Sequence, residues 1–151
     1  MEATFKILET SRNIYLKFLE GYTLEQLNKI PEGFSNNLIW NIGHIVVSQQ
    51  GLIYRLSGLP VNVSDEMTEK YKNGSRPDGK ATQEEVDEIK HLLIALAQQT
   101  KTDFEAGKFQ HYTEYQTKTG FHLANFKDAM EFSNYHEGIH LGMMMNIRKF
   151  L

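Results

Sequence analysis

The placement of proline is the feature that most constrains the fold of this chain. All three prolines lie between segments whose apolar residues recur with the period of a helix. Proline inside a helix removes a hydrogen bond, so this placement leaves the segments free to be helical. Four of these segments are long, and they cover approximately residues 3–19, 37–56, 82–100 and 123–151. The sequence therefore predicts an all-α protein. Its 151 residues, 40% of them apolar, are enough for one core, so we expect a single domain over residues 1–151.

Capping residues mark the ends of these segments. Thr23 predicts the start of a short helical turn over residues 24–30, and Ser35 or Asn36 is expected to cap the second long helix. Thr82 and Glu85 are predicted to form a capping box at the start of the third.

Two polar connections separate the long helices. Residues 61–81 are interpreted either as a lid or binding loop or as a plain crossover between distant helices. Residues 103–122 are predicted to form a loop with one short hairpin, because threonine and tyrosine recur there among polar residues.

Composition excludes several classes of function. The net charge is −3 and the basic residues are scattered, whereas a nucleic-acid surface needs a concentrated basic face, so we expect no nucleic-acid partner. We also expect no membrane partner and a cytoplasmic location, since the chain lacks both a secretion signal and a run of about 18 apolar residues. Because cysteine is absent, any metal must be bound by histidine, carboxylate or water.

Two of the six histidines, His136 and His140, are four residues apart and lie about 40° apart on one helix face. Such a pair can bind one metal ion, although two structural histidines can share this spacing by chance. The same face carries a stripe expected to face the core, formed by Phe126, Ala129, Ser133, Met143, Met144, Ile147 and Leu151. Burying an imidazole without a partner costs ~1–3 kcal/mol, so the pair needs hydrogen bonds or a metal.

The second long helix offers a third ligand, His44. On this otherwise apolar helix His44 shares a narrow strip with Asn37, Trp40, Asn41, Val47, Ser48, Gly51 and Arg55. The strip is interpreted as lining a cavity, and the alternative is that it faces water. Three imidazoles from facing helices leave a coordination position open, which is typical of catalytic sites. His91, His111 and His122 share no spacing or face and are predicted to lie at the surface or in loops.

The segment NNLIWNIGHI at residues 36–45, followed by HEGIHLG at residues 136–142, resembles the DinB-like superfamily of metalloenzymes, as does TLEQLN at residues 23–28. The resemblance covers essentially the whole chain. It implies a four-helix bundle with a long crossover connection, frequent homodimers, and one divalent transition metal (zinc, nickel or iron) held by a histidine triad. The triad falls on His44, His136 and His140. Characterised relatives include transferases and isomerases that use thiols such as bacillithiol or mycothiol.

Two functional interpretations remain open. In the first, a metal-dependent transferase or hydrolase activates water or a low-molecular-weight thiol that attacks a small electrophilic substrate. Trp40, Ser48 and Arg55 then line the substrate pocket, although Arg55 is equally interpreted as a solvated charge. Glu137 is interpreted as an exposed helix residue or, alternatively, as a base or a residue that orients a ligand. In the second interpretation the bundle is not catalytic: the metal only stabilises it, or it is a stress-associated binding module.

Two further expectations concern association and pH. If the polar strip of the second helix lines a cavity, both of its apolar flanks must be covered, and a second subunit covering one of them makes the protein a homodimer. The alternative is that the first helix and residues 61–81 of the same chain cover that flank. Metal affinity is expected to fall as the pH drops through the ordinary histidine pKa of about 6.5.

Overall fold

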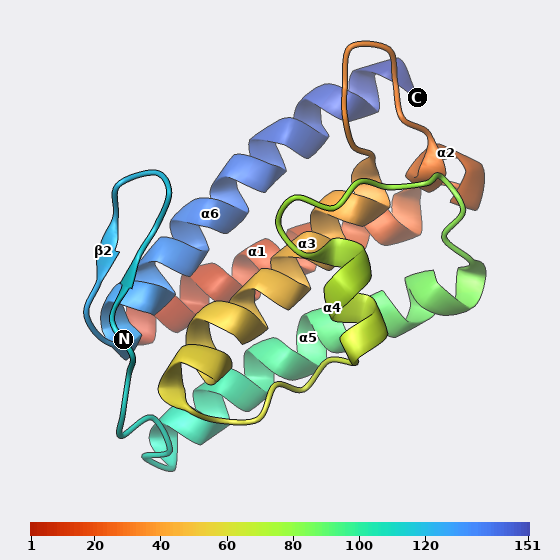
Figure 1. The fold of residues 1–151 in the computed structure, drawn as a ribbon. Coiled ribbons are helices and arrows are strands. Elements are labelled where there is room, and N and C mark those ends of the chain that lie inside the picture. The colour runs from red at the N-terminus through yellow and green to blue at the C-terminus, as the bar shows by residue number, and fades with distance from the viewer.

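The computed structural model describes residues 1–151, and it is mostly helical, so the all-α prediction is confirmed. The four long helices are α1 (Glu2–Gly21), α3 (Leu38–Gln49), α5 (Gln83–Glu105) and α6 (Phe126–Ile147). Figure 1 shows that α1 and α6 run in one direction along the molecule, whereas α3 and α5 run in the other. Helix α1 packs against α5 and α6, and α3 also packs against α5 and α6. None of these helices is long and apolar enough to cross a membrane.

Because α3 and α5 run in the same direction, the chain must return along the molecule between them. Residues 58–82 make this return, and they include a short helix, α4 (Asp65–Tyr71), which packs on α3. The Ser64 hydroxyl caps α4 by accepting a hydrogen bond from the Met67 amide. The sequence did not predict α4, because its seven residues contain only two buried side chains, Met67 and Tyr71, and these are too few to show a helical period.

The second long helix changes its winding near its end. Its periodicity predicts one helix over 37–56, but regular α-helix ends at Gln49 and is followed by a π turn, η1 (Gln50–Tyr54), and a 3-10 turn, η2 (Arg55–Ser57). A π turn adds a residue to the helical repeat, so it rotates later residues away from the strip that a uniform helix predicts. The cap is Asn37, one residue later than expected, and its side chain accepts from the Trp40 amide.

The chain itself buries both apolar flanks of α3. Six of the eight flank residues are at most 2% exposed, namely Leu38, Ile39, Ile42, Ile45, Val46 and Ile53. The cover comes from α1, α4, α5 and α6, so residues 61–81 contribute to it as in the alternative interpretation. These six residues are therefore covered within one chain, as in the alternative interpretation, whereas Leu52 and Leu56 are partly buried. The homodimer itself stays a prediction.

Helices α5 and α6 differ only in detail from the sequence predictions. The Thr82 hydroxyl caps α5 as predicted, but the Glu85 carboxylate does not reach back to complete a capping box, because it binds Tyr71 and Lys70 of α4. Helix α5 extends to Glu105, beyond the predicted end near residue 100. A complete capping box instead occurs at Thr23, ahead of α2 (Leu24–Asn28).

The predicted hairpin is present between α5 and α6. Its strands are β1 (Tyr115–Gln116) and β2 (His122–Leu123), which pair in antiparallel register. Helix α6 then begins after its cap Asn125, two or three residues later than predicted, and η3 (Arg148–Phe150) follows it. The hairpin packs on α6 through β2.

Candidate metal centre

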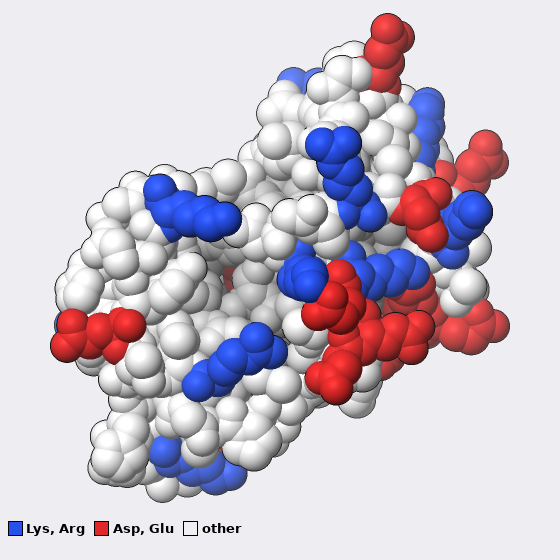
Figure 2. Space-filling model, in the orientation of Figure 1, with Lys and Arg blue, Asp and Glu red and all other residues white.

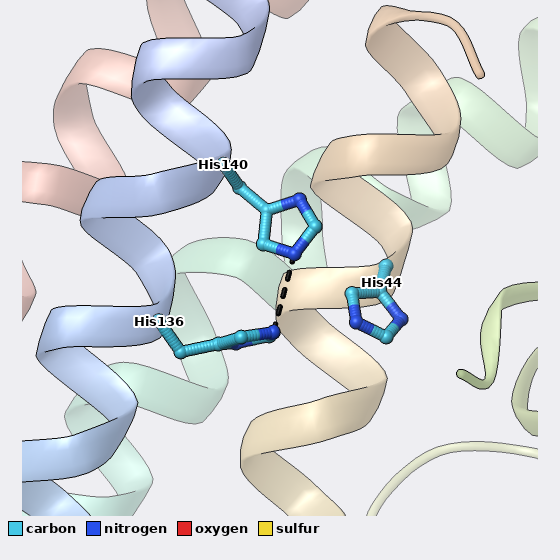
Figure 3. Close-up of side chains that lie close together, drawn as sticks. All are labelled: His44, His136 and His140. Carbon is cyan, nitrogen blue, oxygen red and sulfur yellow. Dashed lines mark hydrogen bonds between the residues drawn. The ribbon is translucent and has the colours of Figure 1, made fainter. Parts of the chain in front are cut away.

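The three histidines of the predicted triad lie together between α3 and α6. One ring nitrogen of each of His44, His136 and His140 lies within 4.8 Å of the others, and Figure 3 shows the rings converging from the two helices. The Nε2 atoms of His136 and His140 are 3.2 Å apart. Two nitrogens that bind one tetrahedral ion at ~2.0–2.1 Å are separated by about 3.3 Å. This group of side chains can therefore hold a metal ion.

A backbone carbonyl fixes the orientation of the His44 ring. The Nδ1 atom of His44 lies 2.7 Å from the carbonyl oxygen of Tyr71, at the end of α4. Since a carbonyl only accepts hydrogen bonds, Nδ1 must carry the proton, and Nε2 is left with a free lone pair. The Trp40 ring stacks on the His44 ring with centroids 4.8 Å apart. Both the tautomer and the plane of His44 are thus determined by its neighbours.

Asn41 plays the corresponding role for His140. Its Oδ1 lies 2.8 Å from Nδ1 of His140, and its Nδ2 donates to the backbone carbonyl of Asn37 and to the side chain of Asn36. These two donations require the oxygen to face His140, so Nδ1 of His140 is the donor and Nε2 is again free. The sequence placed Asn41 on the polar strip but assigned it no role.

Burial keeps the triad neutral. Burial is the larger cause and the neighbouring histidine rings the smaller one, and together they lower the pKa of His136 to about 4 and that of His140 to about 3. Burial also lowers the pKa of His44. Neutral imidazole is the form that binds metal. In the folded protein, protons therefore compete with a metal at a lower pH than the ordinary histidine pKa predicts.

The structure brings two of the three predicted pocket residues to the triad. Besides stacking on His44, Trp40 is 8% exposed and donates from Nε1 to the Ser75 hydroxyl. The Ser48 hydroxyl lies 3.2 Å from Nε2 of His44. Arg55 is exposed and follows the π turn, which fits a solvated charge. The surface is hollowed between α6 and α3, and charged side chains stand around this hollow (Figure 2).

Glu137 is not an exposed residue, a base or an orienter of the triad. It is 1% exposed and accepts two hydrogen bonds from the Arg12 guanidinium of α1, at 3.1 Å from Nε and 2.7 Å from Nη2. Burial raises the pKa of Glu137, and Arg12 opposes that rise. The sequence did carry a signal for this pair, because Arg12 lies between Leu8 and Tyr15 on the core stripe of α1, where an unpaired charge is not tolerated.

An aromatic cluster that the sequence did not predict adjoins His136. Phe132 stacks against the His136 ring and contacts Phe121 of the hairpin segment, and Phe121 contacts Tyr135. Phe121 and Tyr135 are 42% and 52% exposed. The α6 side of the triad is therefore apolar. The remaining histidines, His91, His111 and His122, lie at the surface, as predicted.

Comparison with known proteins gives an independent result. The DinB superfamily matches residues 7–144, which include both histidine motifs and most of the chain. No curated protein matches the sequence. The match agrees with the histidine motifs and with the helical fold, so the chain belongs to the DinB superfamily.

Proposed function

We propose that this chain is a metal-dependent enzyme that binds one divalent transition metal ion through His44, His136 and His140. In this proposal the enzyme activates water or a low-molecular-weight thiol. The activated group is then transferred to a small electrophilic substrate, or hydrolyses it. The observation that carries the proposal is the arrangement of three neutral imidazoles, one buried and two partly buried, with ring nitrogens within 4.8 Å of one another.

The set of available donors supports a catalytic site rather than a structural one. The group consists of three histidines without a carboxylate or thiolate, so the protein supplies three ligands. Structural zinc sites are usually closed by four protein ligands, whereas catalytic sites keep a position open. Imidazole donors suit zinc, nickel and iron alike, and the proposal does not choose among them.

A bound metal would lower the pKa of a coordinated water or thiol, so that the reacting anion forms near neutral pH. The protein's own residues prepare the site for this. Hydrogen bonds to Tyr71 and Asn41 hold His44 and His140 with their Nε2 atoms unprotonated. The Ser48 hydroxyl can donate to or accept from a group at the triad, because it already reaches Nε2 of His44. Glu137 takes no part in proton transfer, since Arg12 occupies its carboxylate.

Apolar walls on two sides point to a substrate with an apolar part. Trp40 forms one wall against His44, and Phe132 forms the other against His136. Phe121 and Tyr135 extend the second wall to the surface, where their exposed rings can contact a substrate. Binding sites for small molecules are commonly apolar with a few polar groups that set orientation. Arg55 stays a predicted contact for an anionic group of the substrate.

We also propose a fold, a location and an oligomeric state for the chain. The four long helices are assigned to a four-helix bundle with residues 58–82 as its crossover, in one domain over residues 1–151, as expected for the DinB superfamily. A cytoplasmic location and a homodimer belong to this proposal as well. Light scattering and localisation in cells are the corresponding measurements.

Elemental analysis of protein purified without an affinity tag tests the proposed metal site. We expect about one metal ion per chain, and we expect His44→Ala and His136→Ala to abolish stoichiometric binding. His91→Ala is the matched control, because His91 is exposed on α5 and should leave the metal content unchanged. Unchanged metal content in both triad variants would reject the site.

Turnover separates an enzyme from a bundle that the metal only stabilises. Loaded protein should exchange a water molecule at its metal and should consume a thiol or water together with an electrophilic substrate. Full metal loading with no exchangeable water would instead favour the non-catalytic alternative.

A further inference from the structure

We propose that Tyr71 is a positioning residue of the metal centre, and that the crossover helix α4 holds His44 in the form that binds metal. This inference rests on the proposed metal function, and it concerns a residue that none of the histidine motifs contains. It follows from three contacts that Tyr71 makes with its backbone carbonyl, its ring and its hydroxyl.

The first contact is the hydrogen bond from His44 to the Tyr71 carbonyl. The last carbonyls of a helix lack partners within the helix, and Tyr71 is the last residue of α4, so its carbonyl is free to accept from Nδ1 of His44. Both residues are buried, at 2% and 4% exposed, and water therefore has little access to replace either partner. The position of the end of α4 thus decides which nitrogen of His44 carries the proton.

The second contact explains how α4 comes this close to α3. The Tyr71 ring lies directly on the backbone of Gly43, the residue before His44. A Cβ atom at position 43 would lie 2.6 Å from Cε1 and 2.7 Å from Cγ of Tyr71, closer than real Cβ atoms approach their neighbours. Any larger residue at position 43 must therefore push the ring, and the helix that carries it, away from α3.

The third contact holds the far end of the ring. The Tyr71 hydroxyl donates to the Glu85 carboxylate in the first turn of α5, and Lys70 binds the same carboxylate at 2.6 Å. Tyr71 is thereby held against α3 by its ring and against α5 by its hydroxyl. This clamp fixes the carbonyl that orients His44.

Hydrogen-bond partners of metal ligands set their tautomer and raise their basicity, and losing such a partner typically lowers metal affinity ~10–100-fold. We expect a loss of this size when the Tyr71 carbonyl moves away from His44. The expected change in the metal-free protein is a loss of the fixed Nδ1–H tautomer, which can be measured without any metal.

The test compares Gly43→Ala with a matched control, Gly142→Ala. A Cβ at Gly142 meets nothing within 4 Å, so the control adds the same methyl group to a helix without touching Tyr71. Zinc affinity is measured by competition with a chelator, and the site is monitored by the visible absorption of bound cobalt(II). We expect Gly43→Ala to weaken zinc binding ~10–100-fold and to change the cobalt spectrum, whereas Gly142→Ala changes neither.

A double-mutant cycle with Tyr71→Ala separates positioning from general destabilisation. If Gly43→Ala acts through the Tyr71 ring, it weakens zinc binding in the wild-type background but has little further effect once the ring is removed. Additive losses of affinity would overturn the proposal. If Gly43→Ala alone does not fold, Tyr71→Ala tests the same contact, and it should weaken zinc binding to a similar extent.

Nitrogen-15 NMR of the metal-free protein measures the tautomer of His44 directly, without any metal binding. His44 should show a protonated Nδ1 in the wild type and in Gly142→Ala, and a mixture of tautomers in Gly43→Ala. A folded Gly43→Ala protein that keeps the Nδ1–H tautomer and wild-type zinc affinity would reject the inference. If the wild type binds none of zinc, nickel and iron but its tautomer depends on Gly43, the proposed function fails while the orientation of His44 by Tyr71 stands.

Discussion

Asn41 shows how one buried side chain can set the chemistry of a neighbouring histidine. Its amide nitrogen donates to Asn36 and to the N-cap residue Asn37, just before α3, and its oxygen accepts from His140. We predict that Asn41→Leu lowers metal affinity ~10–100-fold, since His140 loses the partner that orients it. The same change should lower the free energy of unfolding by ~1–3 kcal/mol, because it leaves a buried imidazole N–H unpaired. Chelator competition and urea denaturation measure the two effects.

Asn41→Asp is the informative control for that prediction. The carboxylate keeps an acceptor for Nδ1 of His140 but loses the two donations to Asn36 and Asn37 at the start of α3. We therefore expect metal affinity close to that of the wild type, together with reduced stability. Equal metal affinities for the leucine and aspartate variants would show that the oxygen of Asn41 does not orient His140.

The lowered pKa values of the triad also predict how the stability of the metal-free protein depends on pH. Burial lowers the pKa of His136 to about 4 and that of His140 to about 3, whereas the unfolded chain titrates near the ordinary value of about 6.5. Below that value the unfolded state binds more protons than the folded state, so stability falls as the pH drops from about 6.5 towards 4. Above it, the two states bind equally few protons, and the triad adds no pH dependence.

Urea denaturation of metal-free protein between pH 8 and pH 4 measures this effect. A variant with His136→Gln and His140→Gln should lose part of the slope between about pH 6.5 and pH 4, because two of the groups responsible are gone. An unchanged slope would show that other groups, such as paired carboxylates, control the acid sensitivity.

At the scale of elements, the ion pair between Arg12 and Glu137 joins α1 to α6. Both side chains are 1% exposed, so each charge depends on the other for compensation. Removing one partner leaves a buried uncompensated charge, and we predict that Arg12→Met lowers the free energy of unfolding by ~3–5 kcal/mol. On α6, Glu137 lies between His136 and His140, one residue after the first and three before the second, so the loss should loosen the helix that carries both histidines.

The double variant Arg12→Met with Glu137→Met is the control for this pair. Replacing a whole buried ion pair by apolar residues is often neutral or stabilising, so most of the lost stability should return. The Nη1 atom of Arg12 has no hydrogen-bond partner in the structure, and its removal favours the double variant further. A double variant no more stable than Arg12→Met would show that packing, rather than charge compensation, dominates at this position.

At the scale of the whole molecule, the burial of α3 means that a charged substitution of its apolar residues affects folding. Ile39 and Val46 are 2% and 0% exposed within a single chain. We predict that Ile39→Asp and Val46→Asp unfold the protein, because each places an unpaired charge in the core. Far-UV circular dichroism measures the outcome. A folded Val46→Asp protein would mean that α3 is less enclosed than the structure indicates.

The homodimer remains a prediction for the whole molecule, and light scattering of the wild-type protein tests it directly. We expect a mass of about twice 17.5 kDa that does not change on moderate dilution. A mass of one chain at all concentrations would reject the dimer. Charged substitutions on α3 are unsuitable for this test, because they affect folding before association.

Metal binding should raise the thermal stability of the whole chain, because the triad joins two helices that are far apart in sequence. A ligand at 100 times its Kd that binds only the folded state adds ~2.7 kcal/mol to the free energy of unfolding. We predict a higher Tm with zinc than with a chelator, and no such difference in His140→Ala. Calorimetry measures both, and an equal zinc effect in the variant would place the bound ion elsewhere.

Much of this protein is determined by its sequence alone, because local patterns carry the relevant physics. Proline positions and helical periods predict the four long helices, and two cap predictions, Thr23 and Thr82, agree with the structure. The spacing of His136 and His140, together with the polar strip of α3, brings three histidines together on facing helices. The motifs also predict membership of the DinB superfamily.

The tertiary structure decided the features that depend on contacts between distant segments. Arg12 and Glu137 are 125 residues apart in sequence, and the His44 hydrogen bond to Tyr71 spans 27 residues. A period within one helix shows which face is buried, but it does not show which side chain meets that face. The π turn at residues 50–54 likewise has no periodic signal, and it changes the helical winding just before Arg55. The triad's neighbours and the cover over α3 therefore follow from packing.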